Sequence, residues 1–162
     1  MPAAAVRAYV ALGANLGDPV ATLRVALDQL ERLPDTALAA QSSLYATQPV
    51  DAGGPDYCNA VAALDTRLDA LDLFHALQGI ERAHGRERSY RNAPRTLDLD
   101  LLLYGDTRMD TPALTLPHPR MHLRAFVLAP LAEIAPELVI PAHGAVRQLL
   151  AAITDQPIRK LP

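Results

Sequence analysis

The sequence predicts an α+β protein of the ferredoxin-like kind, in which a β-α-β-β-α-β order builds one antiparallel sheet with both helices on one face. Three observations support this prediction. Four segments have the length and apolar character of strands, namely 6–12, 37–45, 57–66 and 95–104. Two segments with helical periodicity lie between them. The chain has 162 residues, which is enough for a single domain over 1–162 with a buried core.

Both predicted helices have clear start and stop signals. Asp18 followed by Pro19 is typical of an N-cap and a first helical position, and Pro34 ends this helix. Asp69 is expected to cap the second helix, and Gly85 is expected to follow its end. The apolar residues expected to face the sheet are Val20, Leu23, Leu27 and Leu30 on the first helix, and Leu73, Phe74, Leu77 and Ile80 on the second.

The rest of the chain is expected to cover part of the open face of the sheet, giving an α/β/α sandwich with C-terminal additions. The expected elements are a hairpin strand over 107–110, a rigid loop over 117–120, a helix over 123–134, a short strand over 138–140 and a last helix over 146–153. Pro130 is expected to bend or break the first of these helices. The prolines and glycines of 46–56 predict a loop there.

The strand that contains Asp98 and Asp100 is the centre of the functional argument. Alternation puts these two carboxylates on one face, with their Cα atoms roughly 6–7 Å apart, and the leucines on the other. The leucines are Leu97, Leu99, Leu101 and Leu103. Two like charges side by side repel, and a cation between them removes that cost. Mg²⁺ suits such a pair because it takes few protein oxygens and keeps water and phosphate as its other ligands.

A cluster of arginines precedes this strand. The cluster contains Arg82, Arg86, Arg88, Arg91 and Arg95. Arginine binds phosphate through paired hydrogen bonds, and the chain has a single lysine, Lys160. Carboxylates for magnesium beside guanidinium groups for phosphate predict a nucleoside triphosphate site. The alternative for either feature alone is an amphipathic strand or a solvated basic loop.

Charge and composition exclude several classes of protein. The net charge is −3, whereas a dedicated nucleic-acid binder is usually basic, so no nucleic-acid partner is expected. The one cysteine, Cys58, excludes an internal disulfide and fits a reducing compartment. No apolar run reaches the length of a membrane span, and the N-terminal residues do not read as a signal peptide. A cytoplasmic location without membrane association is therefore expected.

Other polar residues give weaker signals. His118 and His122 are four residues apart, but Pro119 excludes the helical zinc motif, so no zinc is expected. His118 in its proline-rich loop is a candidate phosphate contact, whereas His122 is expected to be a plain surface histidine. From the residues alone, Gln78 and Glu81 are expected to form an exposed polar stripe.

Several segments resemble one enzyme family. The run PRTLDLDLLLYG at 94–105 closely resembles the signature of the 6-hydroxymethyl-7,8-dihydropterin pyrophosphokinases of folate biosynthesis. Further segments match in the same order, namely 12–17, 55–60, 78–81, 85–86 and 117–131. The resemblance therefore spans nearly the whole chain.

The resemblance implies a monomeric, ferredoxin-like transferase that uses ATP and two magnesium ions. Such an enzyme moves the β,γ-pyrophosphoryl group of ATP to the hydroxymethyl oxygen of 6-hydroxymethyl-7,8-dihydropterin and releases AMP. By position, it implies that Asp98 and Asp100 hold both metals and act in catalysis with Arg86 and Arg95. The implied contacts of ATP are Gln78, Glu81, Arg86, Arg88, Arg95, His118 and Arg124. The implied pterin pocket contains Thr47, Tyr57, Asn59 and Phe126, with the two aromatic rings stacked on the pterin.

The sequence also departs from the family pattern and leaves alternatives open. Asn92 stands where many relatives have a tryptophan in the loop that closes over the site, and Arg91 and Tyr90 are expected to supply part of that lid. One alternative is an RNA-binding module of the same fold that uses the arginine loop, although the usual sheet aromatics are absent. Another is a regulatory module that binds a small ligand without turnover.

Overall fold

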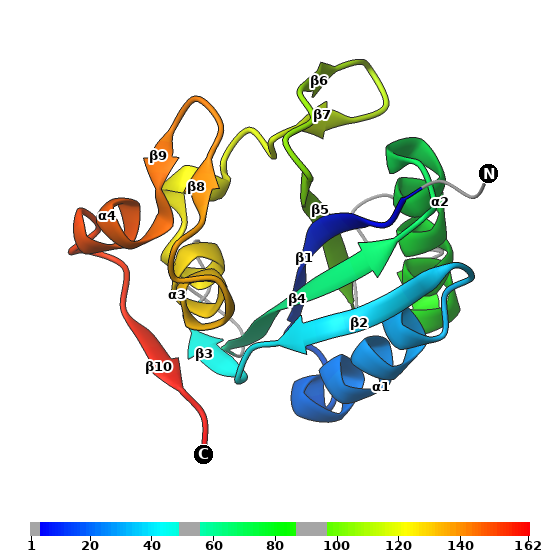
Figure 1. Ribbon diagram of the computed structural model, residues 1–162. Coiled ribbons are helices and arrows are strands. Elements are labelled where there is room, and N and C mark those ends of the chain that lie inside the picture. The colour runs from blue at the N-terminus through cyan, green and yellow to red at the C-terminus, as the bar shows by residue number, and fades with distance from the viewer. Residues whose placement is uncertain (1–3, 49–55, 87–96) are drawn as a thin grey trace.

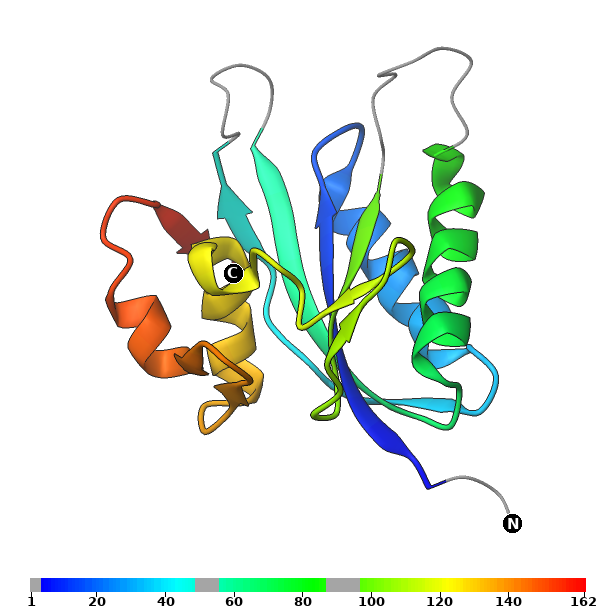
Figure 2. The same cartoon turned by 90° about the horizontal axis from the view of Figure 1, so that it is seen from above.

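The centre of the molecule is an antiparallel β-sheet with helices on both faces (Figure 1). The structure is a computed structural model and describes residues 4–48, 56–86 and 97–162. The helices α1 (Pro19–Glu31) and α2 (Ala70–Glu81) cover one face. On the other face lies α3 (Ala125–Ile134), with α4 (Val146–Ala151) packed beside it (Figure 2). The predicted α+β class, with an antiparallel sheet and helices packed on it, is confirmed.

The sheet has one long path of strands in the order β10-β3-β4-β1-β5, and β2 pairs with the other part of the β4 edge. Its strands are β1 (Val6–Ala14), β2 (Thr36–Gln41), β3 (Tyr45–Thr47), β4 (Tyr57–Thr66), β5 (Asp98–Tyr104) and β10 (Ile158–Lys160). Two small hairpins lie outside it, β6 (Met109–Asp110) with β7 (Thr115–Leu116), and β8 (Val139–Ile140) with β9 (Gly144–Ala145). All strand pairings of this sheet among the described residues are antiparallel, as the chain order predicts.

Alternation along the strands divides the apolar residues between two cores. On β1, Ala8, Val10 and Leu12 face α1 and α2, whereas Tyr9 and Ala11 face α3. The first core is completed by the predicted helical face, of which Leu23, Leu27, Leu30, Leu73, Leu77 and Ile80 are buried. Val20 and Phe74 are partly buried at its margin.

The second core lies between the sheet and α3. Val61 and Ala63 of β4 pack there against Leu128 and Leu131. Pro130 lies inside α3 and is buried, so the expected break does not occur. A proline removes one backbone donor from a helix, but the apolar contacts of this face keep the segment helical.

The predicted strand over 37–45 is two strands in the structure. β2 ends at Gln41 and β3 begins at Tyr45, and both pair with β4. Ser42 holds the break, because its backbone N–H donates to the Val61 carbonyl oxygen at 2.9 Å while its Oγ accepts from the Val61 N–H at 2.9 Å. The predicted loop over 46–56 therefore starts later than expected, and its residues 49–55 lie outside the described part.

The expectation that Leu103 shares a face with Leu101 is wrong. The pairing of β5 with β1 shifts between Tyr9 and Val10, which pair with Leu103 and Leu101. Leu102 is the extra residue of this bulge, so Leu102 and Leu103 both pack in the α3 core. A bulge reverses the alternation beyond it, and period-two counting cannot locate it.

Three further features differ from the sequence expectations. The second helix does not end at Gly85 but continues into a π-helical turn, Arg82–Arg86. A 3₁₀ turn, Met121–Leu123, precedes α3, so the predicted single helix over 123–134 begins later. The C-terminal strand β10 was not expected. None of the helices in the described part of the chain combines the length and apolar character of a membrane span.

The caps of the helices come partly from distant residues. As predicted, Asp18 and Asp69 cap α1 and α2, accepting from the N–H groups of Ala21 at 3.1 Å and Asp72 at 2.7 Å. The N-terminus of α3 has no side-chain cap of its own. Gln156 supplies one instead: its Oε1 accepts from the Ala125 N–H at 2.9 Å, and its Nε2 donates to the Leu123 carbonyl oxygen at 2.9 Å.

Gln156→Ala is expected to lower the free energy of unfolding by about 1 kcal/mol, because it leaves a helix-terminal N–H without its protein partner. Urea unfolding of the purified protein measures this change. The matched control is Gln148→Ala on α4, since Gln148 is also exposed and its side chain makes no hydrogen bond to the described part of the chain. Equal midpoints for the two variants would contradict the capping role.

Candidate active site

Asp98 and Asp100 lie on the face of the sheet that α3 covers. Gly13 of β1 pairs with Asp98, and Ala11 pairs with Asp100. Directly paired residues of an antiparallel sheet share a face, and Ala11 belongs to the α3 core. Asp98 is half-buried and Asp100 is exposed. The strand therefore presents both carboxylates side by side toward an accessible surface, as the alternation predicts.

Glu81 holds the backbone between these two residues. The side chain is 3% exposed, and its Oε2 accepts a hydrogen bond from the Leu99 N–H at 2.9 Å. Among the strands of the described residues β5 lies at the edge of the sheet, so part of its backbone has no partner from a neighbouring strand there. The carboxylate supplies that missing partner from the last residue of α2. The expected exposed polar stripe is thus wrong for Glu81, while Gln78 is half-buried one turn earlier.

His118 lies close to the acidic pair. Its backbone N–H donates to the Leu102 carbonyl oxygen at 2.9 Å, which fixes the loop after β7 against β5. Burial lowers the pKa of His118, and the nearby charges of Arg124 and Arg120 lower it further, against the opposing effect of Asp100. The ring is therefore neutral at pH 7. Since Nδ1 accepts from the Arg120 N–H at 3.1 Å, the neutral ring carries its hydrogen on Nε2.

Arg124 and Phe126 lie at the N-terminus of α3. The guanidinium carbon of Arg124 lies 5.4 Å from the centroid of the Phe126 ring, a distance at which a cation is attracted to the ring face. Arg124 is the residue before the first turn of α3, between the two backbone groups that Gln156 holds. A positive charge and an aromatic face are thereby fixed at the same point.

Asn59 and Thr47 form a second polar group on this face of the sheet. Asn59 is 6% exposed, and its Oδ1 accepts from the Thr47 hydroxyl at 2.7 Å, so the orientation of the amide is fixed. Tyr57 pairs with Thr47 and lies half-buried next to them. A Cβ atom at Gly13 would lie 3.2 Å from Asn59 Nδ2. The absence of a side chain at Gly13 therefore leaves room for this amide.

The strand register places the two polar groups in one row. Tyr45, Asn59, Gly13 and Asp98 are successive partners across β3, β4, β1 and β5. Neighbouring strands are roughly 4.8 Å apart, so Asn59 and Asp98 stand about 10 Å from each other with Gly13 between them. The ends of these strands lie together in Figure 2. A small molecule that rests on Gly13 would reach both groups.

Part of the predicted site lies outside the described residues. This applies to Arg88, Arg91 and Arg95 and to the side chain of Arg86, as well as to Tyr90 and Asn92 of the expected lid. The described part brings together the other predicted residues, namely Asp98, Asp100, His118, Arg124, Phe126, Thr47, Tyr57 and Asn59, with Gln78 one turn before Glu81. The backbone role of Glu81 and the spacing role of Gly13 were missed. A glycine inside a strand is the signal that could have found Gly13, whereas the burial of Glu81 depends on the distant strand β5 and has no local signal.

The acidic side chains of this face suit a hard cation that prefers oxygen ligands and takes few of them from the protein. Among the described residues there is no group of three or more His, Cys, Asp or Glu side chains that could hold a metal ion. Two carboxylates on one strand agree with Mg²⁺, which keeps several water or phosphate oxygens as ligands. Transition metals that prefer several imidazole or thiolate ligands fit this face poorly.

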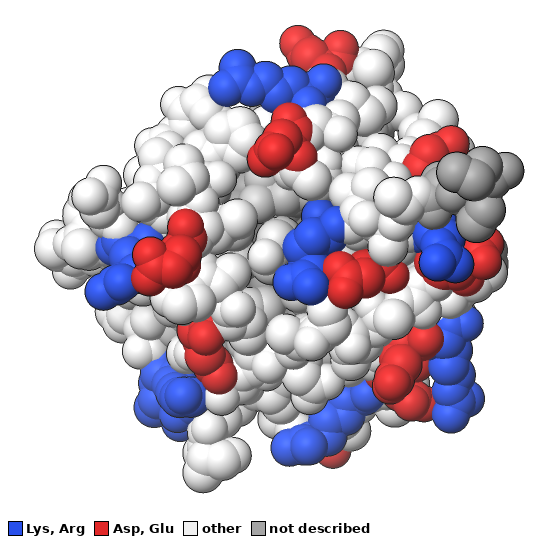
Figure 3. All heavy atoms as spheres, in the orientation of Figure 1, with Lys and Arg blue, Asp and Glu red and all other residues white. Residues whose placement is uncertain are grey.

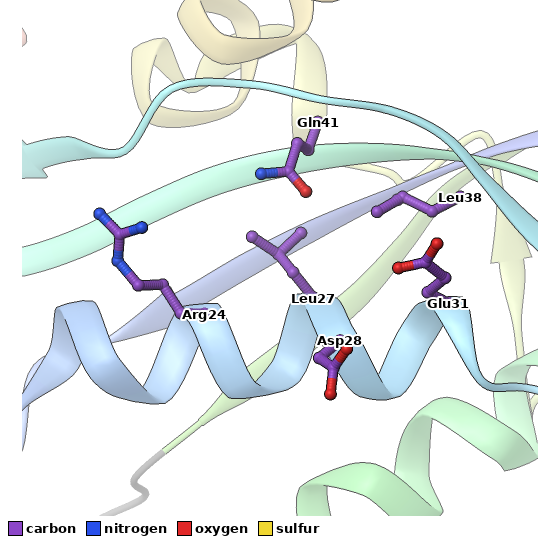
Figure 4. Close-up of a pocket in the computed structure, with 6 residues that line it drawn as sticks. All are labelled: Arg24, Leu27, Asp28, Glu31, Leu38 and Gln41. Atoms are coloured by element: carbon purple, nitrogen blue, oxygen red, sulfur yellow. The ribbon is translucent and has the colours of Figure 1, made fainter.

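Two other features lie away from this face. A groove of about 260 Å³ opens between α1 and β2, lined by Arg24, Leu27, Asp28, Glu31, Leu38 and Gln41 (Figure 4). It is on the α1 side of the sheet, opposite the carboxylates, and its charged residues are exposed. His122 is not a plain surface histidine, because its ring stacks on His143 with centroids 3.6 Å apart.

The combination of paired carboxylates, a neutral histidine, an arginine and a fixed amide on one sheet face suits an enzyme that handles a phosphorylated substrate. Comparison with known proteins agrees. A family model described as 7,8-dihydro-6-hydroxymethylpterin-pyrophosphokinase matches residues 9–136. The chain therefore belongs to the 7,8-dihydro-6-hydroxymethylpterin-pyrophosphokinase family.

Individual relatives are similar over most of the chain. A 2-amino-4-hydroxy-6-hydroxymethyldihydropteridine pyrophosphokinase of Pseudomonas aeruginosa is 51% identical over 157 residues, which cover 96% of this chain and 97% of the relative. One of Haemophilus influenzae is 44% identical over 157 residues, covering 96% and 98%. A solved HPPK-DHPS structure in complex with substrates has a TM-score of 0.76 at 14% identity, covering 93% of this chain and 43% of that chain. That structure supports the fold.

Glu81→Ala is expected to lower the free energy of unfolding by about 2 kcal/mol, because the Leu99 N–H loses its partner in a buried place. Glu81→Gln is expected to lose less, since an amide oxygen can still accept this hydrogen bond. Chemical denaturation followed by circular dichroism measures both. Glu31→Ala, an exposed acid near the end of α1, is the matched control. Loss in the control as large as in Glu81→Ala would contradict the assignment.

Proposed function

We propose that this protein transfers the β,γ-pyrophosphoryl group of ATP to the hydroxymethyl oxygen of 6-hydroxymethyl-7,8-dihydropterin, giving AMP and the pterin diphosphate for tetrahydrofolate synthesis. The observation that carries the proposal is the strand row in which Asn59, Gly13 and Asp98 are successive partners. It puts a fixed amide and an acidic pair on one face, at a distance that a substrate of this size can span. Family membership supports the same reaction.

Asp98 and Asp100 are the proposed ligands of two magnesium ions. When bound, such ions neutralise phosphate charge and align the attacking and leaving oxygens. Glu81 fixes the backbone between the two ligands, so we assign it to positioning them rather than to a direct contact with ATP. A rigid strand suits this task because pyrophosphoryl transfer depends on positioning more than on covalent catalysis.

The proposed pterin pocket uses the second polar group. A flat, uncharged ring requires apolar faces and a few fixed polar partners at its edge. Asn59 offers a fixed amide because Thr47 holds its oxygen. Tyr57 from the sheet and Phe126 from α3 are the proposed stacking partners. The hydroxymethyl group would then point along the row toward Asp98.

The phosphates of ATP are proposed to lie between the acidic pair and α3. His118 can donate from Nε2 in its neutral form, and Arg124 supplies a full positive charge that Phe126 holds in place. Gln78, Arg86, Arg88 and Arg95 complete the proposed nucleotide contacts. In the reaction, the hydroxymethyl oxygen loses its proton, which passes to solvent, and bonds to the β-phosphorus. The bond from this phosphorus to the oxygen that bridges to the α-phosphate breaks, and AMP leaves with that oxygen.

We also propose a fold description, a location and an oligomeric state for the protein. The order β-α-β-β-α-β, with β2 and β3 as one interrupted strand, supports a ferredoxin-like description. We propose a single domain over 1–162 that acts as a cytoplasmic monomer. The one cysteine, Cys58, is buried, and burial raises the pKa of its thiol, which supports a structural rather than a reactive role.

The two alternative functions are less well supported. An RNA-binding module of this class presents its open sheet face to the bases, whereas α3 covers much of that face here. Lysine and arginine alternate with aspartate and glutamate over the surface in Figure 3, without a basic stripe on the face shown. A regulatory module would leave the acidic pair on β5 without a purpose.

Product analysis tests the proposal. With ATP, Mg²⁺ and 6-hydroxymethyl-7,8-dihydropterin, the protein is expected to form AMP in equal amount to the pterin diphosphate, and excess EDTA is expected to stop the reaction. Asp98→Asn and Asp100→Asn should each lower turnover by about 10³-fold or more, given the share of the barrier that charge stabilisation supplies. Asp106→Asn, in the turn after β5, is the control. ADP as the product, or full activity in EDTA, would overturn the proposal.

Gly13→Ala is expected to raise KM for the pterin about tenfold and to leave KM for ATP nearly unchanged. The added methyl group would press on Asn59 Nδ2, which Thr47 prevents from rotating freely. Steady-state kinetics with each substrate varied in turn measures the effect. The control is Ala14→Gly, in the same strand but facing the other core. Gly17→Ala is unsuitable because Gly17 has a φ of 65°, a conformation that strains a residue with a side chain. A rise in KM for ATP alone would contradict the assignment of Asn59.

A further inference from the structure

Glu133 near the end of α3 makes the densest set of side-chain hydrogen bonds in the described part of the chain. Its carboxylate accepts from the Ser43 N–H at 3.0 and 3.1 Å, from the Ser43 hydroxyl at 2.9 Å and from the Tyr45 hydroxyl at 2.6 Å. The Lys160 ammonium lies 4.0 Å away. One side chain thus joins α3 to the break between β2 and β3 and to the last strand, β10.

The carboxylate is held in its charged form. Burial alone would raise the pKa of Glu133, but the hydrogen bonds from Tyr45 and Ser43, together with the charge of Lys160, lower it. Burial and the same carboxylate raise the pKa of Tyr45, so its hydroxyl remains a donor. Hydrogen bonds to an ionised acceptor are stronger than neutral ones, and this network is present throughout the neutral pH range.

On the sheet, Glu133 holds Ser43 and Tyr45, and Tyr45 adjoins the proposed pterin pocket. Tyr45 is the direct partner of Asn59, and Thr47 two residues later donates to Asn59 Oδ1. β3 is only three residues long and follows the break after Gln41, so its position depends on its pairing with β4 and β10 together with the contacts of Glu133. A displacement of β3 would move the Thr47 hydroxyl and release the Asn59 amide.

The other group that Glu133 holds is the opposite wall of the same pocket. Phe126 lies at the start of α3, about two turns before Glu133 on the same helix. A rigid helix transmits a displacement of its end to its beginning. Thus one carboxylate fixes the distance between the helix that carries Phe126 and the strand that carries Thr47.

We infer that Glu133 is a positioning residue for pterin binding, acting through Tyr45 and Ser43 to fix the separation of Phe126 from the Thr47–Asn59 pair. The inference rests on the proposed function, because it assigns the pocket between these walls to the pterin. Glu133 itself touches neither substrate in this account. Glu133 does not hold the proposed metal ligands, since Asp98 and Asp100 lie on β5, which β4 and β1 separate from β3.

Glu133→Gln is expected to raise both KM and Kd for the pterin about tenfold, which corresponds to about 1.4 kcal/mol, and to raise KM for ATP by a smaller factor, since Arg124 at the start of the same helix is one of several proposed ATP contacts. Fluorescence titration of the pterin gives Kd without turnover. Tyr45→Phe, which removes one donor, is expected to give part of the same effect. The double variant is expected to be no worse than Glu133→Gln, because both changes break one network.

The matched control is Glu137→Gln, since Glu137 lies four residues further along the chain, just beyond α3, and makes only an exposed ion pair with Arg147 at 3.5 Å among the described residues. A purely structural role for Glu133 would lower the unfolding midpoint and the active fraction but leave Kd for the pterin equal to that of the control. That result would overturn the inference. Failure of the unsubstituted protein to bind the pterin would instead count against the proposed function itself.

Discussion

The register of four strands is the constraint on which the proposed site depends. Because paired residues of an antiparallel sheet share a face, the partners Asn59, Gly13 and Asp98 must present their side chains to the same side. Gly13 then separates an amide from a carboxylate by the width of two strand spacings and adds no side chain of its own. A slip of one residue in β5 would turn the carboxylates into the core of α1 and α2.

The later part of the chain covers part of this sheet face. α3 covers the apolar half of the face with Leu128 and Leu131, and its first turn brings Arg124 and Phe126 to the polar half. Neither end of this helix is fixed by neighbours in sequence. Gln156 caps its beginning and Glu133 ties its end to β3, so distant segments determine where the wall stands.

The local pattern of the sequence predicted the elements better than their contacts. Alternation and caps located β1, β4, α1 and α2, and the Asp98-x-Asp100 pattern located the acidic pair, since each depends on neighbouring residues only. The bulge at Leu102, the break at Ser42 and the strand β10 depend on pairing with distant segments, which period-two counting does not contain. Glu81 was expected at the surface because the local sequence does not contain the contact that buries it. That contact is the hydrogen bond of its carboxylate to the backbone of the distant strand β5.

A crystal structure with 6-hydroxymethyl-7,8-dihydropterin, Mg²⁺ and an ATP analogue that has a methylene group between the α- and β-phosphorus tests the central claim most directly. The account predicts the pterin edge on Asn59, its ring beside Phe126, and the metal ions on Asp98 and Asp100 with the β-phosphate between the two groups. Binding of either ligand in the groove between α1 and β2, or metal ions away from β5, would contradict it.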